Sequence, residues 1–218
     1  MEKRIVRVRF EKTGPIQYIS HLDLGRTFSR ALRRMNAPLW FSEGYHPHPK
    51  LTFALPLSVG TQSLCEICDV AVVADAPAGC LNGLGDQLPQ GLRVTALEEG
   101  SLRKLADIAF AQYVLTFPTA QVGAQALEER LCQPLPVEKH GKKGPVTLDV
   151  AQQLSQLSVS STPEGLSLSV VLPAGGERGI LNPEYLLKAL ETQESFAHLS
   201  RDCRIVRQRL LDAAGQTF

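Results

Sequence analysis

The chain has 218 residues, of which 44% are hydrophobic and 21% charged, and its formal net charge is +1. These values exclude a disulfide-stapled miniprotein and predict one large or two small globular domains. No apolar run approaches the roughly 18 residues of a membrane-spanning helix, and no signal peptide is recognisable. Five irregularly spaced cysteines fit reduced thiols, so we expect a cytoplasmic protein.

The small net charge conceals an uneven distribution along the chain. Residues 1–50 carry ten Lys and Arg against four Asp and Glu, residues 51–108 carry three against seven, and residues 109–218 carry ten against eleven. The first quarter is therefore predicted to form a basic face, suited to an anionic partner such as RNA, a phosphate or an acidic protein surface. The alternative is a solvated helix face whose arginines pair with local acids.

The first hundred residues combine strand and helix patterns. Residues 4–10 alternate apolar and basic side chains, as a half-buried strand does. Ser20 is a suitable N-cap for a helix from His21 to about Met35, which Pro38 would follow. Further strands are expected at 38–42, 51–57, 64–73 and 92–97, with a short helix within 77–88. We interpret this order as β-α-β-β-α-β, the ferredoxin-like arrangement.

The second half repeats this order after a charged connector at residues 98–108. Strands are expected at 112–117, 137–140, 154–161, 166–172 and 203–210, and helices at 122–131 and 183–190. Pro183 occupies the first position of the last helix, after Asn182 as N-cap. Residues 211–218 are expected to be a loose tail. We predict an α+β protein of two tandem ferredoxin-like (βαββαβ) subdomains with mostly antiparallel sheets, over residues 1–100 and 109–218.

The residues best suited to binding lie between Gly14 and Gly60. Helical spacing places three arginines opposite the apolar stripe of the predicted helix. The start of that helix, at His21 and Asp23, would favour a phosphate, and nearby tyrosines would stack on bases. The predicted RNA-binding residues are Arg26, Arg30, Arg33, Tyr45, His46, His48 and Lys50, with Lys142 and Lys143 from a later turn.

Three residues at the start of the helix are candidates for catalysis. His21 with Tyr18 could perform general acid–base chemistry on a ribose 2′-OH. Asp23 could act as a nucleophile. The structural alternative makes Asp23 a first-turn acid favoured by the helix dipole, with Tyr18 and Tyr45 as packing residues.

Two further motifs have the residue types of metal sites. His46 and His48 would point the same way in an extended segment, with His21 as a third ligand, but no acid is paired with them. Cys65 and Cys68 form a CxxC within a strand pattern, which places the two thiols on opposite faces. We therefore predict no metal and no cofactor.

A family resemblance rests on VRVRFEKTGPIQYISHLDLGRTFSRALRR, PLWFSEGYHPHPKLTFALPLSVG and CEICDV, and more weakly on KKGPVTLDVAQQL and LNPEYLLKAL. These segments resemble the radical-SAM-linked bacterial proteins of the DUF2344 family, whose function is unknown. The resemblance implies a separate radical-SAM partner with a B12-binding-type domain. It also suggests RNA, because ribosomal-protein and RNase genes are typical neighbours of the family. It supplies no catalytic residue.

These observations together lead us to expect an accessory RNA-binding module that works with the radical-SAM partner in rRNA or tRNA modification. One alternative is an RNA-processing or RNA-modifying enzyme. His21 would be the acid–base residue of an endoribonuclease, or Asp23 the nucleophile of a pseudouridine-synthase-like enzyme. A further alternative is a subunit whose basic face docks only onto protein.

Overall fold

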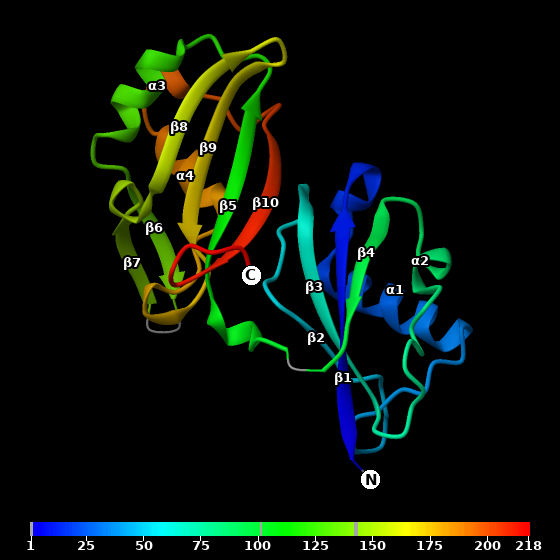
Figure 1. Ribbon diagram of the computed structural model, residues 1–218. Helices are drawn as coiled ribbons and strands as arrows, with labels where there is room; N and C mark the ends of the chain where they lie inside the picture. Colours follow the sequence, from blue (N-terminus) through cyan, green and yellow to red (C-terminus); the bar gives the residue numbers. More distant parts are fainter. Residues whose placement is uncertain (1, 101, 142–143) are drawn as a thin grey trace. The chain divides into compact units, whose positions relative to one another are not determined.

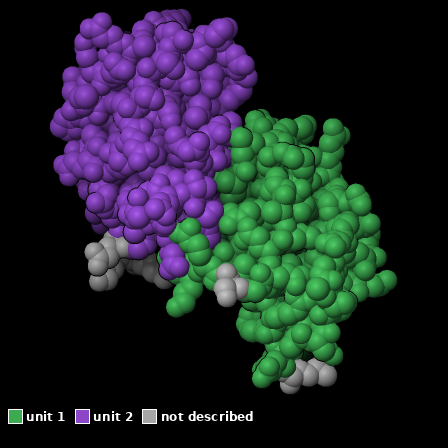
Figure 2. Space-filling view, in the orientation of Figure 1, with its two compact units in different colours: residues 1–106 green, residues 107–218 purple. Residues whose placement is uncertain are grey.

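The computed structural model describes residues 2–100, 102–141 and 144–218, excluding the side chains of residues 140, 141 and 177. The chain divides into two compact units, Met1–Ala106 and Asp107–Phe218, which Figure 2 colours separately. Each unit contains an antiparallel sheet and two α-helices (Figure 1). The predicted α+β class with mostly antiparallel sheets is confirmed. Within the described ranges, none of the helices has both the length and the apolar character needed to cross a membrane.

Unit 1 contains a four-stranded antiparallel sheet in the order β4-β1-β3-β2. Helices α1 and α2 contribute side chains to one core on one face of this sheet (Figure 1). Its elements are β1 (Lys3–Lys12), the 3-10 turn η1 (Gly14–Tyr18), α1 (His21–Arg34), β2 (Leu51–Phe53), β3 (Thr61–Val73), α2 (Leu84–Gln87) and β4 (Leu92–Glu98), followed by the 3-10 turn η2 (Leu105–Asp107).

The core of unit 1 forms because the period of each element directs its apolar residues to the same side. Val6, Val8 and Phe10 alternate along β1 and are fully buried. They face the buried stripe of α1, which includes Leu24 and Phe28. The opposite face of α1 carries its charged residues and stays exposed. Because the apolar stripe of α1 packs on the sheet, the arginines on its opposite face are held at fixed positions.

Local signals in the sequence determine both ends of α1. The Ser20 hydroxyl accepts a hydrogen bond from the Asp23 backbone N–H at 3.1 Å and donates one to the Asp23 carboxylate at 2.7 Å. This reciprocal cap satisfies an N–H group that the helix leaves without an intrahelical partner. After the helix, Asn36 adopts the left-handed conformation, with a φ of 53°.

Replacing Ser20 with alanine is expected to lower the free energy of unfolding of unit 1 by about 1 kcal/mol, because the cap is lost. Urea denaturation followed by the fluorescence of Trp40, the chain's only tryptophan, would measure the change. Ser29→Ala, within the same helix, is the matched control and is expected to change stability by no more than about 0.5 kcal/mol. Equal effects of the two substitutions would contradict the role given to the cap.

Unit 2 orders its main strands β10-β5-β9-β8, again with antiparallel pairing throughout. A separate hairpin of β6 and β7 lies between α3 and β8 in the chain. The elements are β5 (Ile108–Phe117), α3 (Ala124–Leu131), β6 (Pro136–Gly141), β7 (Gly144–Asp149), η3 (Ala151–Gln153), β8 (Ser155–Thr162), β9 (Gly165–Pro173), η4 (Gly176–Arg178), α4 (Pro183–Leu190), η5 (Glu194–Phe196) and β10 (Arg204–Asp212).

Several predicted elements differ from the structure. The strand expected at 38–42 consists only of isolated bridges, and the strand expected at 51–57 ends at Phe53. A strand that was not expected, β7, begins at Gly144 and pairs with β6; residues 142–143 between the two strands lie outside the described part of the chain. The prediction of a loose tail at 211–218 is wrong, because Phe218 donates its backbone N–H to Leu210 at 2.9 Å. Backbone pairing thus holds the end of the chain against β10.

Candidate functional site

An open groove of about 510 Å³ lies between helix α1 and the segment 48–53 in unit 1. It is here called the α1 groove. One wall is the charged face of α1, and the floor is mostly apolar. The lining residues are His21, Leu22, Gly25, Arg26, Ser29, Arg30, Arg33, His48, Pro49, Leu51 and Phe53. Five of the predicted site residues, His21, Arg26, Arg30, Arg33 and His48, therefore lie around one hollow.

Phe53 forms the aromatic part of the floor and is held by the core beneath it. Its ring meets Phe28 edge to face, with centroids 5.6 Å apart, and lies 6.3 Å from the ring of Phe10. On its groove side it contacts His21 edge to face at 5.2 Å. Such edge-to-face pairs fix ring orientation in addition to burying apolar area. The groove thus has a rigid aromatic floor with an imidazole beside it.

The arginine wall has three members in different surroundings. Arg26 forms an ion pair with Asp23 at 3.0 Å, and the guanidinium of Arg33 lies 5.5 Å from the ring centroid of Phe41. Within the described part of the chain, Arg30 makes no hydrogen bond and no ion pair. The spacings of four and three residues place all three cations on one helix face. This row of like charges favours the approach of an anion.

The loop that contains His46 and His48 is closed by a small set of hydrogen bonds. Ser42 donates its backbone N–H to the His48 carbonyl at 2.9 Å, and its hydroxyl lies 2.9 Å from His48 Nδ1. His48 lines the groove, and Ser42 does not. His46 and Tyr45 are exposed and do not line the groove; Tyr45, at the loop tip, has a relative exposure of 101%. Lys50 lines a different pocket.

The catalytic candidates are only partly brought together. Tyr18 is exposed in η1, and among the described contacts no hydrogen bond joins it to His21. Asp23 accepts hydrogen bonds from Ser20 and Arg26, and these two interactions hold the pKa of its carboxyl below the usual range. Asp23 therefore has a structural role as a capping acid. Only His21 of the three lines the α1 groove.

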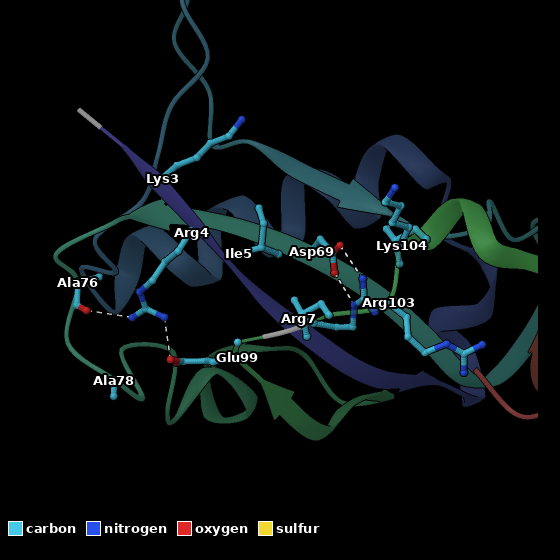
Figure 3. A pocket seen from close by; sticks show the side chains of 13 residues that line it. Lys3, Arg4, Ile5, Arg7, Asp69, Ala76, Ala78, Glu99, Arg103 and Lys104 are labelled. Atoms are coloured by element: carbon cyan, nitrogen blue, oxygen red, sulfur yellow. Dashed lines mark hydrogen bonds and ion pairs between the residues drawn. The ribbon is translucent and has the colours of Figure 1, made fainter.

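The three arginines of strand β1 are neutralised by acids of β3, of β4 and of the residue that follows β4. Arg7 makes a two-bonded ion pair with Asp69 of β3, at 2.7 and 2.9 Å, and Arg4 pairs with Glu99 at 2.7 Å. Figure 3 shows both pairs in a pocket of about 760 Å³ on unit 1. Arg9 pairs likewise with Glu98. The charge excess of residues 1–50 is thus partly balanced in space, because cross-strand pairing joins it to the acidic segment that follows.

The remaining predicted groups are the His pair, the CxxC and the lysine pair. Among the described residues, no three His, Cys, Asp or Glu side chains are grouped so that they could hold a metal ion. Cys68 is fully buried whereas Cys65 is partly exposed, as expected for strand residues on opposite faces. Burial raises the pKa of the Cys68 thiol, with a smaller contribution from Asp69. Lys142 and Lys143 lie outside the described residues.

Two residues of the groove region were not predicted from the sequence. Phe53 and Phe41 have an ordinary strand pattern, and their positions depend on where the chain returns beside α1. The sequence does contain a signal for Phe53. When a strand follows a helix and returns beside it, the alternate apolar residues of the strand pack against the helix. Phe41 offers no comparable signal.

The fold and the groove define an α+β protein with an exposed, arginine-lined hollow on its first unit. The bacterial family described as "Uncharacterized protein conserved in bacteria (DUF2344)" matches residues 5–183. The chain belongs to this family.

No curated protein matches the chain. Among solved structures, the crystal structure of a "putative glycine cleavage system transcriptional repressor" aligns over 95% of this chain and 99% of its own. The identity is 7% and the TM-score 0.28, which is too low to support an argument about fold or function.

Proposed function

We propose that this protein is an accessory RNA-binding module that acts with a separate radical-SAM protein carrying a B12-binding-type domain in the modification of rRNA or tRNA. The observation that carries the RNA-binding part is the α1 groove, where Arg26, Arg30 and Arg33 stand beside an aromatic floor. The radical-SAM partner rests on the family resemblance of the sequence. We also propose that the two units are tandem ferredoxin-like subdomains, which the matching strand orders support.

The chemistry of the groove suits a single-stranded nucleotide. Arginine guanidinium groups bind phosphate oxygens in pairs, whereas an apolar floor with Phe53 accepts the flat face of a base. A base inside a duplex is stacked on its neighbours and is not free to enter, so a loop, bulge or strand end is the expected substrate. A volume of about 510 Å³ is within the range of small-ligand pockets.

Replacing Arg26, Arg30 and Arg33 together with alanine is expected to weaken binding of single-stranded RNA by at least about tenfold at low salt. The plot of log affinity against log salt is expected to lose about 2 in slope, because each phosphate contact on a single strand contributes about 0.7. Fluorescence anisotropy with a labelled oligonucleotide at several salt concentrations would measure both quantities.

The matched control removes the same number of charges from other exposed positions, as Arg93→Ala, Arg201→Ala and Arg204→Ala in one chain. This control is expected to retain nearly all of the affinity and slope. Wild-type binding that does not weaken with salt, or equal losses in the two triple variants, would exclude the α1 groove as the RNA site. Co-purification with the radical-SAM partner from the native host tests the second part of the proposal separately.

A further inference from the structure

Lys3 and Lys50 come from distant parts of the sequence but lie on the same face of unit 1's sheet. Lys3 of β1 pairs with Val73 of β3. On the other side of β3, Ala71 donates its backbone N–H to the Lys50 carbonyl at 3.0 Å, continuing the register of β2. Residues 71 and 73 point to the same face, and cross-strand neighbours share a face. The two ammonium groups are therefore directed to one side of the sheet.

These two lysines line a second hollow, of about 900 Å³, that also includes the only tryptophan. The nearby Lys50 amine holds the pKa of Lys3 below its ordinary value. Two like charges held together at a solvent-exposed site repel each other, and a bound anion relieves that repulsion. The lining residues are Glu2, Lys3, Trp40, Phe41, Ser42, Glu43, His48, Pro49, Lys50, Leu51 and Thr52.

The second hollow adjoins the α1 groove through shared residues. His48, Pro49 and Leu51 line both hollows. The connection forms a path that runs around the edge of the sheet, because Leu51 and Phe53 face α1 whereas Lys50 faces the other side. Cationic and aromatic side chains follow it from the arginine wall, past His48, to Lys50, Lys3 and Trp40, and the acids Glu2 and Glu43 also line the second hollow. Beyond Lys3 the path meets the pocket of Figure 3, where Arg4 and Arg7 are already paired with Glu99 and Asp69. The Lys3 and Lys50 pair is accordingly the far end of the path.

We infer that a single RNA strand follows this path, with one nucleotide in the α1 groove and a neighbouring phosphate on Lys3 and Lys50 beside Trp40. The inference rests on the proposed function and extends it, because it makes the ligand a strand of several nucleotides rather than one nucleotide. Phosphate contacts position a strand and bases stack on aromatic side chains, so the two hollows would have complementary tasks. His48 marks the point where the strand crosses between them.

The test uses single-stranded RNAs of about two, five and ten nucleotides, a range that covers short and long binding sites. Anisotropy measures affinity, and the fluorescence of Trp40 reports whether RNA reaches the second hollow. The longer strands are expected to bind at least about tenfold more tightly than the shortest and to change Trp40 fluorescence. The shortest strand is expected to leave Trp40 fluorescence unchanged.

The variant Lys3→Ala with Lys50→Ala is expected to bind the shortest strand as the wild type does. It is expected to lose the gain with length and about 0.7 of the salt slope, the contribution of one phosphate contact on a single strand. The control Lys188→Ala with Arg204→Ala removes two exposed cations from unit 2 and is expected to behave as the wild type.

The outcomes separate this inference from the proposed function. No RNA binding by the wild type at any length would overturn both. If the triple arginine variant loses affinity but the double lysine variant keeps the full gain with length and the Trp40 signal, only the inference is overturned. The inference is supported if the gain in affinity with length disappears in the double lysine variant but persists in the wild type and in the control variant.

Discussion

Replacing Phe28 with alanine is expected to lower the free energy of unfolding of unit 1 by about 4 kcal/mol. Phe28 is fully buried between α1 and the sheet, and its ring lies 4.8 Å from that of Phe10 and 5.6 Å from that of Phe53. Truncation removes these contacts and leaves a cavity that the rigid strands fill only in part. Urea denaturation followed by Trp40 fluorescence would measure the loss.

The variant Phe28→Leu is the control for this prediction, because it keeps most of the apolar volume. It is expected to cost about 1.5 kcal/mol or less. The affinity for RNA is a second quantity to measure, because Phe53 loses its supporting neighbour when Phe28 becomes alanine. A cost below about 1 kcal/mol for Phe28→Ala would mean that the three rings do not form the packed centre of unit 1.

Replacing Arg7 with alanine is expected to lower the free energy of unfolding by about 3 kcal/mol. The Arg7 side chain is 2% exposed, and its removal deprives the Asp69 carboxylate, itself 15% exposed, of its two-bonded partner. Removing one partner of a buried pair costs more than the pair itself contributes, because the remaining charge stays desolvated. Urea denaturation of the same protein would quantify the effect.

Arg93→Ala is the matched control, because Arg93 also makes a two-bonded pair, with Glu11, but is 69% exposed. Solvent screens this pair, so the expected cost is below about 1 kcal/mol. The double variant Arg7→Ala with Asp69→Asn is expected to recover part of the lost stability, since it removes the unpaired charge. Similar costs for Arg7→Ala and Arg93→Ala would contradict a buried role for the Arg7 pair.

Helix α1 could be predicted from the sequence because every signal for it is local. Ser20, the apolar spacing and the residues after Arg34 all lie within or beside the helix. The hairpin of β6 and β7 could not be predicted in the same way. Its second strand contains Gly144 and Pro145, which usually indicate a turn, and it is stabilised by pairing with β6. Residues 213–218 give no signal of their pairing either, because the backbone hydrogen bonds that hold them leave no hydrophobic pattern.

Part of the α1 groove could be predicted from neighbouring residues, and part of it depends on contacts between distant segments. Helical periodicity alone predicted that Arg26, Arg30 and Arg33 share a face. Phe53, which forms the floor, lies beside them only because β2 pairs with β3 next to the helix. The pairing of the β1 arginines was also hidden, since their acids follow much later in the sequence. Charge counted along the chain is therefore a poor guide to charge on the surface.

The neutralisation of β1 also has a consequence for the speed of complex formation. Because the chain's net charge is only +1 and Arg4, Arg7 and Arg9 are paired internally, a distant polyanion meets a nearly neutral body outside the proposed path. Long-range attraction that accelerates diffusion is then weak, and encounters are expected to proceed at the ordinary rate of unsteered collisions. Selectivity among RNAs would be decided after contact, by how long each strand stays bound in the α1 groove.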